Sequence, residues 1–227
     1  LHCHSSFSFH AGVPAVRDLV GRAKSLGLKA LALTDTDRMS GLLLFYLECK
    51  RQGLKPILGV ELTDPRHPSE NVVLLARNAV GYGDLCEIIT RRCTYPEDFS
   101  FFDTFSRPWP NLFLLTAFPR QLECLARTPN RAGLYGELVN QSASTRQRSR
   151  AVEQTARSLG IPLAVSNNSF FLEPDDHETH RILAAIGLNS TLSRLGPEEV
   201  APPAAGFRSP DEIARSFPHH EEAVRNT

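Results

Sequence analysis

Several features are scarce or missing in this 227-residue sequence, and each absence narrows the class of protein. No apolar run approaches the ~20 residues that a membrane-spanning helix needs, so a membrane protein is not expected. Lys and Arg total 25 and so do Asp and Glu, so no overall basic field indicates nucleic-acid binding. The sequence begins with Leu1 and not with methionine. A domain excised from a longer chain is therefore one interpretation, and the start carries no information about targeting.

The cysteines are odd in number and include no Cys-x-x-Cys pair. This pattern argues against a zinc ribbon and against a disulfide framework, and it predicts reduced thiols in a cytoplasmic protein. The five cysteines are Cys3, Cys49, Cys86, Cys93 and Cys124.

What the sequence does contain is enough apolar material for one sizeable core, since 41% of its residues are hydrophobic and 22% are charged. Short apolar runs alternate with segments of helical periodicity, which is typical of a parallel sheet with helices packed outside it. We expect strands at 1–4, 28–34, 55–62, 71–76, 111–116, 134–139 and 161–166. We expect helices at 13–26, 38–52, 83–92, 121–126, 144–159 and 175–186. The predicted fold class is α/β, and about seven strand–helix pairs are enough to close a barrel.

Two segments differ from this pattern. Residues 93–110 are rich in Phe and Pro and are predicted to form an ordered loop. The Pro-Pro-Ala-Ala-Gly stretch at 202–206 cannot continue a helix, whereas Ser209 and Pro210 are typical of a helix start. We therefore expect the barrel at 1–187, and at 188–227 an arm outside the barrel whose short helices occupy 209–217 and 219–226.

The first four residues contain a His-x-His pair. On a strand, alternation turns His2 and His4 to one side, where two neutral imidazoles would form half of a metal site. The alternative is two exposed or hydrogen-bonded histidines near a chain end, and the spacing alone does not decide between them. Asp35, Glu61 and Asn168 also fall at predicted strand ends, which is where the functional face of a barrel lies.

Five stretches of the sequence are similar to one known family. They are Leu-His-Cys-His-Ser-Ser-Phe-Ser-Phe at 1–9, Ala-Leu-Ala-Leu-Thr-Asp at 30–35, Lys-Pro-Ile-Leu-Gly-Val-Glu at 55–61, Val-Leu-Leu-Ala-Arg-Asn at 73–78 and Tyr-Gly-Asp-Leu-Cys at 82–86. Together they resemble the polymerase-and-histidinol-phosphatase (PHP) domain that opens bacterial C-family DNA polymerases, the alpha subunits of DNA polymerase III, and most closely the error-prone branch. The resemblance implies a seven-stranded, distorted TIM-like barrel that holds up to three metal ions, usually zinc, manganese or iron, and cleaves phosphoesters.

The resemblance also implies which side chains form the site. His2, His4 and Glu61 stand where metal ligands are expected, and His10, beside Ala11, is a candidate fourth ligand. Asp35 keeps the acid of its motif, and we expect it to line the same cleft as Asp37. Five positions carry other residues where the family has ligands: Thr36, Asn71 and Gln141 replace histidines, Asn168 replaces an aspartate and Phe170 replaces a further histidine. The remaining histidines, His67, His177, His180, His219 and His220, are interpreted as surface or capping residues.

This loss of ligands separates two hypotheses. Two or three cations held ~3.5 to 4 Å apart need several carboxylates to offset their mutual repulsion, and neutral side chains do not supply them. The first hypothesis is therefore a non-catalytic module with one divalent ion at most, zinc or manganese, and no full trinuclear site. Its expected partners are the polymerase body and a proofreading or clamp-associated subunit, with DNA reached only through the parent polymerase. The second hypothesis is an active phosphoesterase or 3′ to 5′ exonuclease that uses a reduced metal site.

Overall fold

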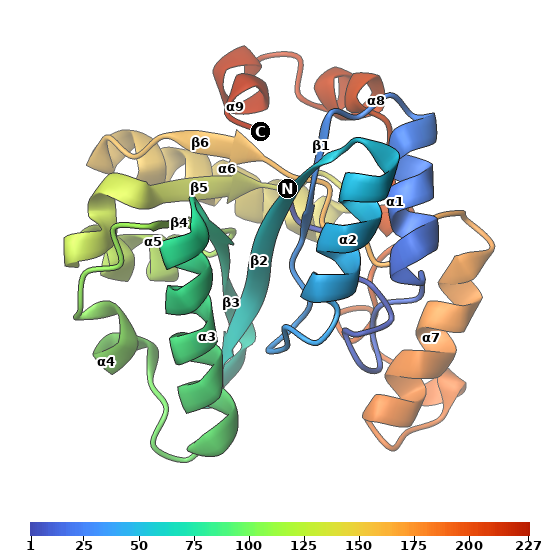
Figure 1. Ribbon diagram of the computed structural model, residues 1–227, viewed down its shortest axis with the longest axis horizontal. Helices are drawn as coiled ribbons and strands as arrows, with labels where there is room; N and C mark the ends of the chain where they lie inside the picture. The colour runs from blue at the N-terminus through green and yellow to red at the C-terminus, as the bar shows by residue number, and fades with distance from the viewer.

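The computed structural model describes the backbone of residues 1–227 and the side chains of all of them except residues 68 and 69. One curled, half-barrel sheet of six strands carries the fold, and its spatial order β1-β2-β3-β4-β5-β6 follows the sequence (Figure 1). The strands are β1 (Ala30–Leu33), β2 (Lys55–Asp64), β3 (His67–Ala76), β4 (Leu112–Thr116), β5 (Leu134–Leu138) and β6 (Leu163–Val165).

The sheet is mixed, so the expectation of a wholly parallel sheet is wrong at β3. Strand β3 runs antiparallel to both β2 and β4, whereas the pairs β1–β2, β4–β5 and β5–β6 are parallel. The reason lies in the connection: only Pro65 and Arg66 separate β2 from β3. A parallel return needs a crossover of a dozen or more residues, so this short turn forces a hairpin.

Helices cover the outside of the sheet, with α1, α2 and α7 on one side and α3 to α6 on the other in Figure 1. They are α1 (Val16–Ser25), α2 (Leu42–Gln52), α3 (Ala79–Thr94), α4 (Phe101–Phe105), α5 (Pro119–Ala126), α6 (Ala143–Leu159) and α7 (Asp176–Gly187), with a 3-10 turn η1 (Pro129–Gly133) before β5. Helix α4 lies where an ordered loop was expected. Ser100 caps its first turn, and Trp109, Phe101 and Phe105 are buried, so packing overrides the Pro-rich flanks.

Alternation along each strand gives the sheet two faces. In β3, Val72 and Leu74 pack outward against the helices, whereas Val73 and Leu75 belong to a separate cluster with Leu115 and Ala164 on the inner face. A side chain's parity within its strand therefore decides whether it faces the helices or the inside of the curl.

The strand expected at 1–4 is reduced to an isolated bridge between Cys3 and Ser169. The Thr34 N–H donates to the Cys3 carbonyl at 3.0 Å, and the His4 N–H donates to the Ser169 carbonyl at 2.9 Å. The first residues thus lie between the ends of β1 and β6. The structure has six strands, not seven, in the chain as described.

Residues 188–227 contain only short elements. These are the 3-10 turns η2 (Leu192–Arg194) and η3 (Pro203–Ala205) and the helices α8 (Pro210–Ser216) and α9 (Glu221–Arg225). Phe217 and Ala223 are buried in the main core cluster, and the side chains of Asn226 and Thr227 donate to carbonyls of β6. The division into a barrel at 1–187 and an arm at 188–227 stays a prediction. Across the described residues, no helix is both long enough and apolar enough to cross a membrane.

Candidate metal centre

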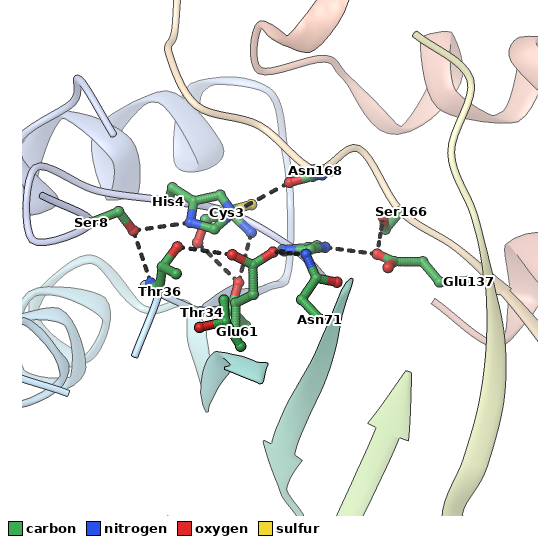
Figure 2. A network of polar contacts seen from close by, with 12 residues as sticks. Cys3, His4, Ser8, Thr34, Thr36, Glu61, Asn71, Glu137, Ser166 and Asn168 are labelled. Carbon is green, nitrogen blue, oxygen red and sulfur yellow. Dashed lines mark hydrogen bonds and ion pairs between the residues drawn. The ribbon is translucent and has the colours of Figure 1, made fainter. Parts of the chain in front are cut away.

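One end of the inner face is polar. Glu61 in β2, Asn71 in β3 and Glu137 in β5 share strand parity with the apolar inner residues Ile57, Val73 and Tyr135. They approach the segment 2–4 that lies between β1 and β6. Figure 2 shows Glu61 between Thr36 and Asn71, and Glu137 beside Ser166.

His2 is fully buried between two carboxylates. Its Nδ1–H donates to Glu137 Oε1 at 2.8 Å, and its Nε2–H donates to Glu61 Oε2 at 3.1 Å. Burial by itself would lower the pKa of His2, but the negative charges of Glu137 and then Glu61 outweigh it and raise the pKa to about 10. Without an ion, His2 is therefore an imidazolium that offsets part of the charge of the two acids.

Glu61 is the acid at the centre of the group. Thr36 Oγ1 donates to its Oε1 at 2.8 Å, and Asn71 Nδ2 donates to its Oε2 at 2.7 Å. Burial alone would raise the pKa of Glu61, but the hydrogen bond from His2 and the nearby charge lower it to about 2. Glu61 is therefore ionised in the folded protein at neutral pH.

His4 completes the group and is buried as well. Phe170 stacks on its ring with the centroids 4.2 Å apart, and Asn168 Oδ1 lies 3.3 Å from its Nε2. Burial is the main cause that lowers the pKa of His4 to about 4, so this imidazole is neutral at pH 7. A neutral imidazole offers a lone pair, which is the form that binds a metal ion.

His2, His4 and Glu61 fit one divalent ion. Each offers a ligand atom, and the three atoms lie within 4.8 Å of one another. Two imidazoles and a carboxylate form a donor set typical of zinc, and Glu137 behind His2 is the outer carboxylate that often accompanies a ligating histidine. Among the residues with described side chains, no second group of His, Cys, Asp and Glu meets the same geometry.

The structure separates Asp35 and Asp37 from these three residues. Asp35 is buried behind His4, where it accepts hydrogen bonds from the Ser5 N–H and from the hydroxyls of Ser5 and Ser8, and burial raises its pKa to about 6. Asp37 turns the other way, with positive φ, and pairs with Arg92 at 2.9 Å. Both residues organise the surroundings of the site without contributing a ligand atom.

The structure places three further residues that the sequence singled out. His10 does not join the group: it is exposed on a turn with positive φ, beside Gly187 of α7, and that turn carries its ring away from the strand ends. Gln141 donates to the carbonyls of Asn167 and Asn168 and so supports the backbone next to the cleft. His180, interpreted above as a surface residue, is buried, because it bridges two backbone segments.

A small cavity lies beside His2 and Glu137. A cavity of about 50 Å³ is bordered by His2, Asn71, Glu137, Asn168 and Arg148, among others. This volume suits one or two water molecules, since a water occupies ≈ 30 Å³ in the liquid.

Sequence reasoning missed Glu137. Its parity with Tyr135 marks it as a lone acid on the inner face of an apolar strand, which is the feature that would have identified it. Its partner His2 lies 135 residues away in sequence, so the pairing follows only from the fold. Ser8 and Ser166 were missed for the same reason.

Comparison with known proteins assigns the family. Residues 1–177 match the family model described as PHP domain. The chain is 30% identical over 242 residues to an error-prone DNA polymerase of Anaeromyxobacter sp. (strain K). This alignment covers 99% of this chain and 21% of that protein. It is 28% identical over 261 residues to DNA polymerase III subunit alpha of Pseudomonas fluorescens, covering 100% of this chain and 22% of that protein.

The chain thus spans about a fifth of the length of the curated relatives it matches. Among solved structures, an amidohydrolase from Chromobacterium violaceum aligns with a TM-score of 0.47 and 15% identity, over 73% of this chain and 84% of that chain. The family model extends from the first histidines through the whole sheet to the start of α7, and by that match this chain belongs to the PHP domain family.

Proposed function

We propose that this PHP domain is part of a C-family DNA polymerase and acts there as a non-hydrolytic module. The matches to an error-prone DNA polymerase and to DNA polymerase III subunit alpha support this, because each aligns over nearly all of this chain. Its partners are then the polymerase body and a proofreading or clamp-associated subunit. The five free cysteines fit the reducing cytoplasm in which we expect it to work.

One observation carries the non-hydrolytic part of the proposal. Neutral amides stand directly against the candidate ligands: Asn71 donates to Glu61, and Asn168 lies against His4. A second or third cation would need carboxylates or imidazoles at these positions to offset the repulsion between ions.

A single divalent ion, zinc or manganese, fits the remaining donors. His2 and His4 would hold it from the first residues of the chain and Glu61 from β2. Bound there, it would supply positive charge that offsets the buried carboxylates. Its role would be to fasten the segment between β1 and β6 to the sheet.

The second candidate function is a metal-dependent phosphoesterase or 3′ to 5′ exonuclease with a reduced site. The observation in its favour is the convergence of two buried imidazoles and a buried carboxylate at the strand ends. Such a site resembles the three-ligand zinc sites of hydrolytic enzymes.

Metal analysis and an activity assay on the purified 227-residue protein test the two candidates. We expect up to one zinc or manganese ion per chain. We expect no hydrolysis of p-nitrophenyl phosphate or of the 3′ end of labelled DNA with manganese, zinc or iron added. A His2→Ala, His4→Ala double variant is the control: saturable turnover that disappears in this variant would overturn the proposal and establish the phosphoesterase.

A further inference from the structure

We propose that Glu137 and Ser8, the latter fixed by Asp35, are positioning residues that hold both imidazoles with a proton on Nδ1, so that Nε2 is the ring atom of each histidine that a metal ion would take. This deepens the proposed function, because it rests on the same three-residue metal site. It assigns a role to three polar side chains that do not belong to the ligand group.

The first step concerns His2. Glu137 is a carboxylate and can only accept, so the 2.8 Å contact places a proton on His2 Nδ1. Ser166 Oγ donates to the same Glu137 oxygen and holds it in place. All three side chains are buried away from bulk water. The Nε2 atom of His2 is then directed at Glu61 Oε2, 3.1 Å away.

The second step concerns His4, whose partner is a hydroxyl and not an acid. Ser8 Oγ lies 2.9 Å from His4 Nδ1, 2.8 Å from Asp35 Oδ1 and 3.1 Å from the backbone N–H of Thr36. A serine hydroxyl has one proton to donate. The charged acceptor Asp35 takes that proton, since hydrogen bonds to ionised groups are the stronger ones. Ser8 must then accept from His4, which places the proton on Nδ1 and leaves the lone pair on Nε2.

Asp35 is rigid enough for this role. Its Oδ1 accepts from the Ser5 N–H at 2.7 Å, and its Oδ2 accepts from the Ser5 hydroxyl at 2.8 Å. The carboxylate cannot rotate without losing these bonds, so the Ser8 proton stays directed at it. The structure has Asn168 Oδ1 at 3.3 Å from His4 Nε2. With the His4 proton on Nδ1, these two groups form a hydrogen bond when the amide is turned so that its NH₂ group donates to Nε2.

The two histidines are therefore oriented in the same way, because each has a carboxylate on the Nδ1 side of its ring. A carboxylate stands directly behind His2, and a carboxylate acts through a serine behind His4. The hydrogen bond at one ring nitrogen decides which nitrogen is free for a metal, and such outer partners typically change metal affinity about 10- to 100-fold.

Zinc affinity, measured by competition with a chromophoric chelator, tests the role of Glu137. Glu137→Met removes both acceptor oxygens at similar volume, and we expect its zinc dissociation constant to rise about 10- to 100-fold. Glu137→Gln keeps one acceptor oxygen and should lose less. Asp64→Asn changes another buried acid, one whose hydrogen bond among the described residues goes to the Arg66 N–H, and it is the matched control with an expected change below about twofold.

Nitrogen-15 NMR of the histidine rings in zinc-free protein tests the orientation without any metal. In the parent protein His4 should carry its proton on Nδ1, and His2 should give a downfield Nδ1–H resonance. Glu137→Met should lose that resonance, whereas Glu137→Gln should keep it. Ser8→Ala should release His4, so that its proton moves to Nε2 and faces Asn168 Oδ1.

The possible outcomes separate the positioning role of Glu137 and Ser8 from the presence of a metal ion. A His4 proton on Nε2 in the parent protein, or a His2 resonance unchanged in Glu137→Met, would overturn the inference regardless of zinc. The expected NMR pattern together with no zinc binding would support the inference and refute the single-metal part of the proposed function. Zinc affinity unchanged in Glu137→Met, in a parent protein that binds zinc, would show that Glu137 is not a positioning residue.

Discussion

At the scale of single residues, the charges of the buried side chains in the candidate metal centre do not balance. Without an ion, the imidazolium of His2 faces the carboxylates of Glu61 and Glu137, which leaves one negative charge uncompensated. Buried charges are tolerated when they are paired and hydrogen-bonded, and Thr36 and Asn71 supply the remaining donors to Glu61. The neutrality of Asn71 therefore matters in the metal-free protein.

The first prediction concerns this neutrality. Asn71→Asp replaces a donor to Glu61 with a third carboxylate, so like charges meet at a distance near 2.7 Å. We expect the metal-free protein to lose roughly 1–3 kcal/mol of unfolding free energy, and zinc to restore more stability to the variant than to the parent. Thermal unfolding with chelator and with zinc measures both effects.

The control for this variant is Asn78→Asp, the same chemical change at the N-cap of α3. Asp caps a helix as well as Asn does, and the Asn111 side chain, to which Asn78 now donates, can turn its amide to donate to the new carboxylate, so this variant should be close to neutral. If Asn71→Asp is as stable as Asn78→Asp in the presence of chelator, the buried group carries no excess negative charge.

At the scale of elements, the approach of β5 to α6 depends on one glycine. A Cβ at Gly136 would lie 2.8 Å from Leu163 Cδ2 and 2.9 Å from Val152 Cγ1, so the strand can approach the helix this closely only without a side chain there. Glu137 is the next residue of β5. The same close packing therefore fixes the strand that brings Glu137 to His2.

We predict that Gly136→Ala destabilises the protein by about 1–3 kcal/mol through overpacking. Gly21→Ala is the matched control: it lies inside α1, a Cβ added there would meet nothing within 4 Å, and it should add about 0.5–1 kcal/mol through helix propensity. Urea unfolding of both variants gives the two changes. If Gly136→Ala is as stable as the parent protein, α6 can shift away from β5 to make room for the added methyl group.

The elements themselves were largely predictable, because hydrophobic periodicity reports burial directly. The strands after the first and the six main helices overlap their predicted ranges. Gly53 and Gly160 end α2 and α6 with positive φ, the conformation that glycine adopts most easily. The periodicity carried no information on strand direction, which the two-residue turn at Pro65 and Arg66 sets. It also missed α4, whose formation depends on the burial of Phe101 and Phe105.

The site was predictable only in part, for a related reason. His2, His4 and Glu61 come from local motifs, and the structure brings them together. Glu137 depends on contact across the whole sheet, and His10 depends on the direction of one turn. Neither kind of information is present in the residues next to each position.

At the scale of the whole molecule, His180 connects three distant segments. Its Nδ1–H donates to the carbonyl of Ala11 at 2.7 Å, and its Nε2 accepts from the N–H of Ala201 at 2.8 Å. The ring thus joins the turn that follows the His-x-His pair, helix α7 and the segment before α8. Only a neutral imidazole can donate on one side and accept on the other.

The last prediction follows from this requirement. Burial, and then the nearby His177, keep the pKa of His180 below its usual 6.5. The unfolded chain therefore binds a proton more readily than the folded protein does, and stability is complete above about pH 6.5 and falls as the pH decreases below it. Each unit of pKa depression corresponds to about 1.4 kcal/mol.

His180→Gln can donate and accept in the same places but does not titrate, so its melting temperature should fall less than that of the parent between about pH 7 and pH 5. Other buried histidines such as His4 titrate equally in both proteins, so the difference between the two curves isolates His180. Parallel curves would show that the bridge between Ala11 and Ala201 does not depend on a neutral ring.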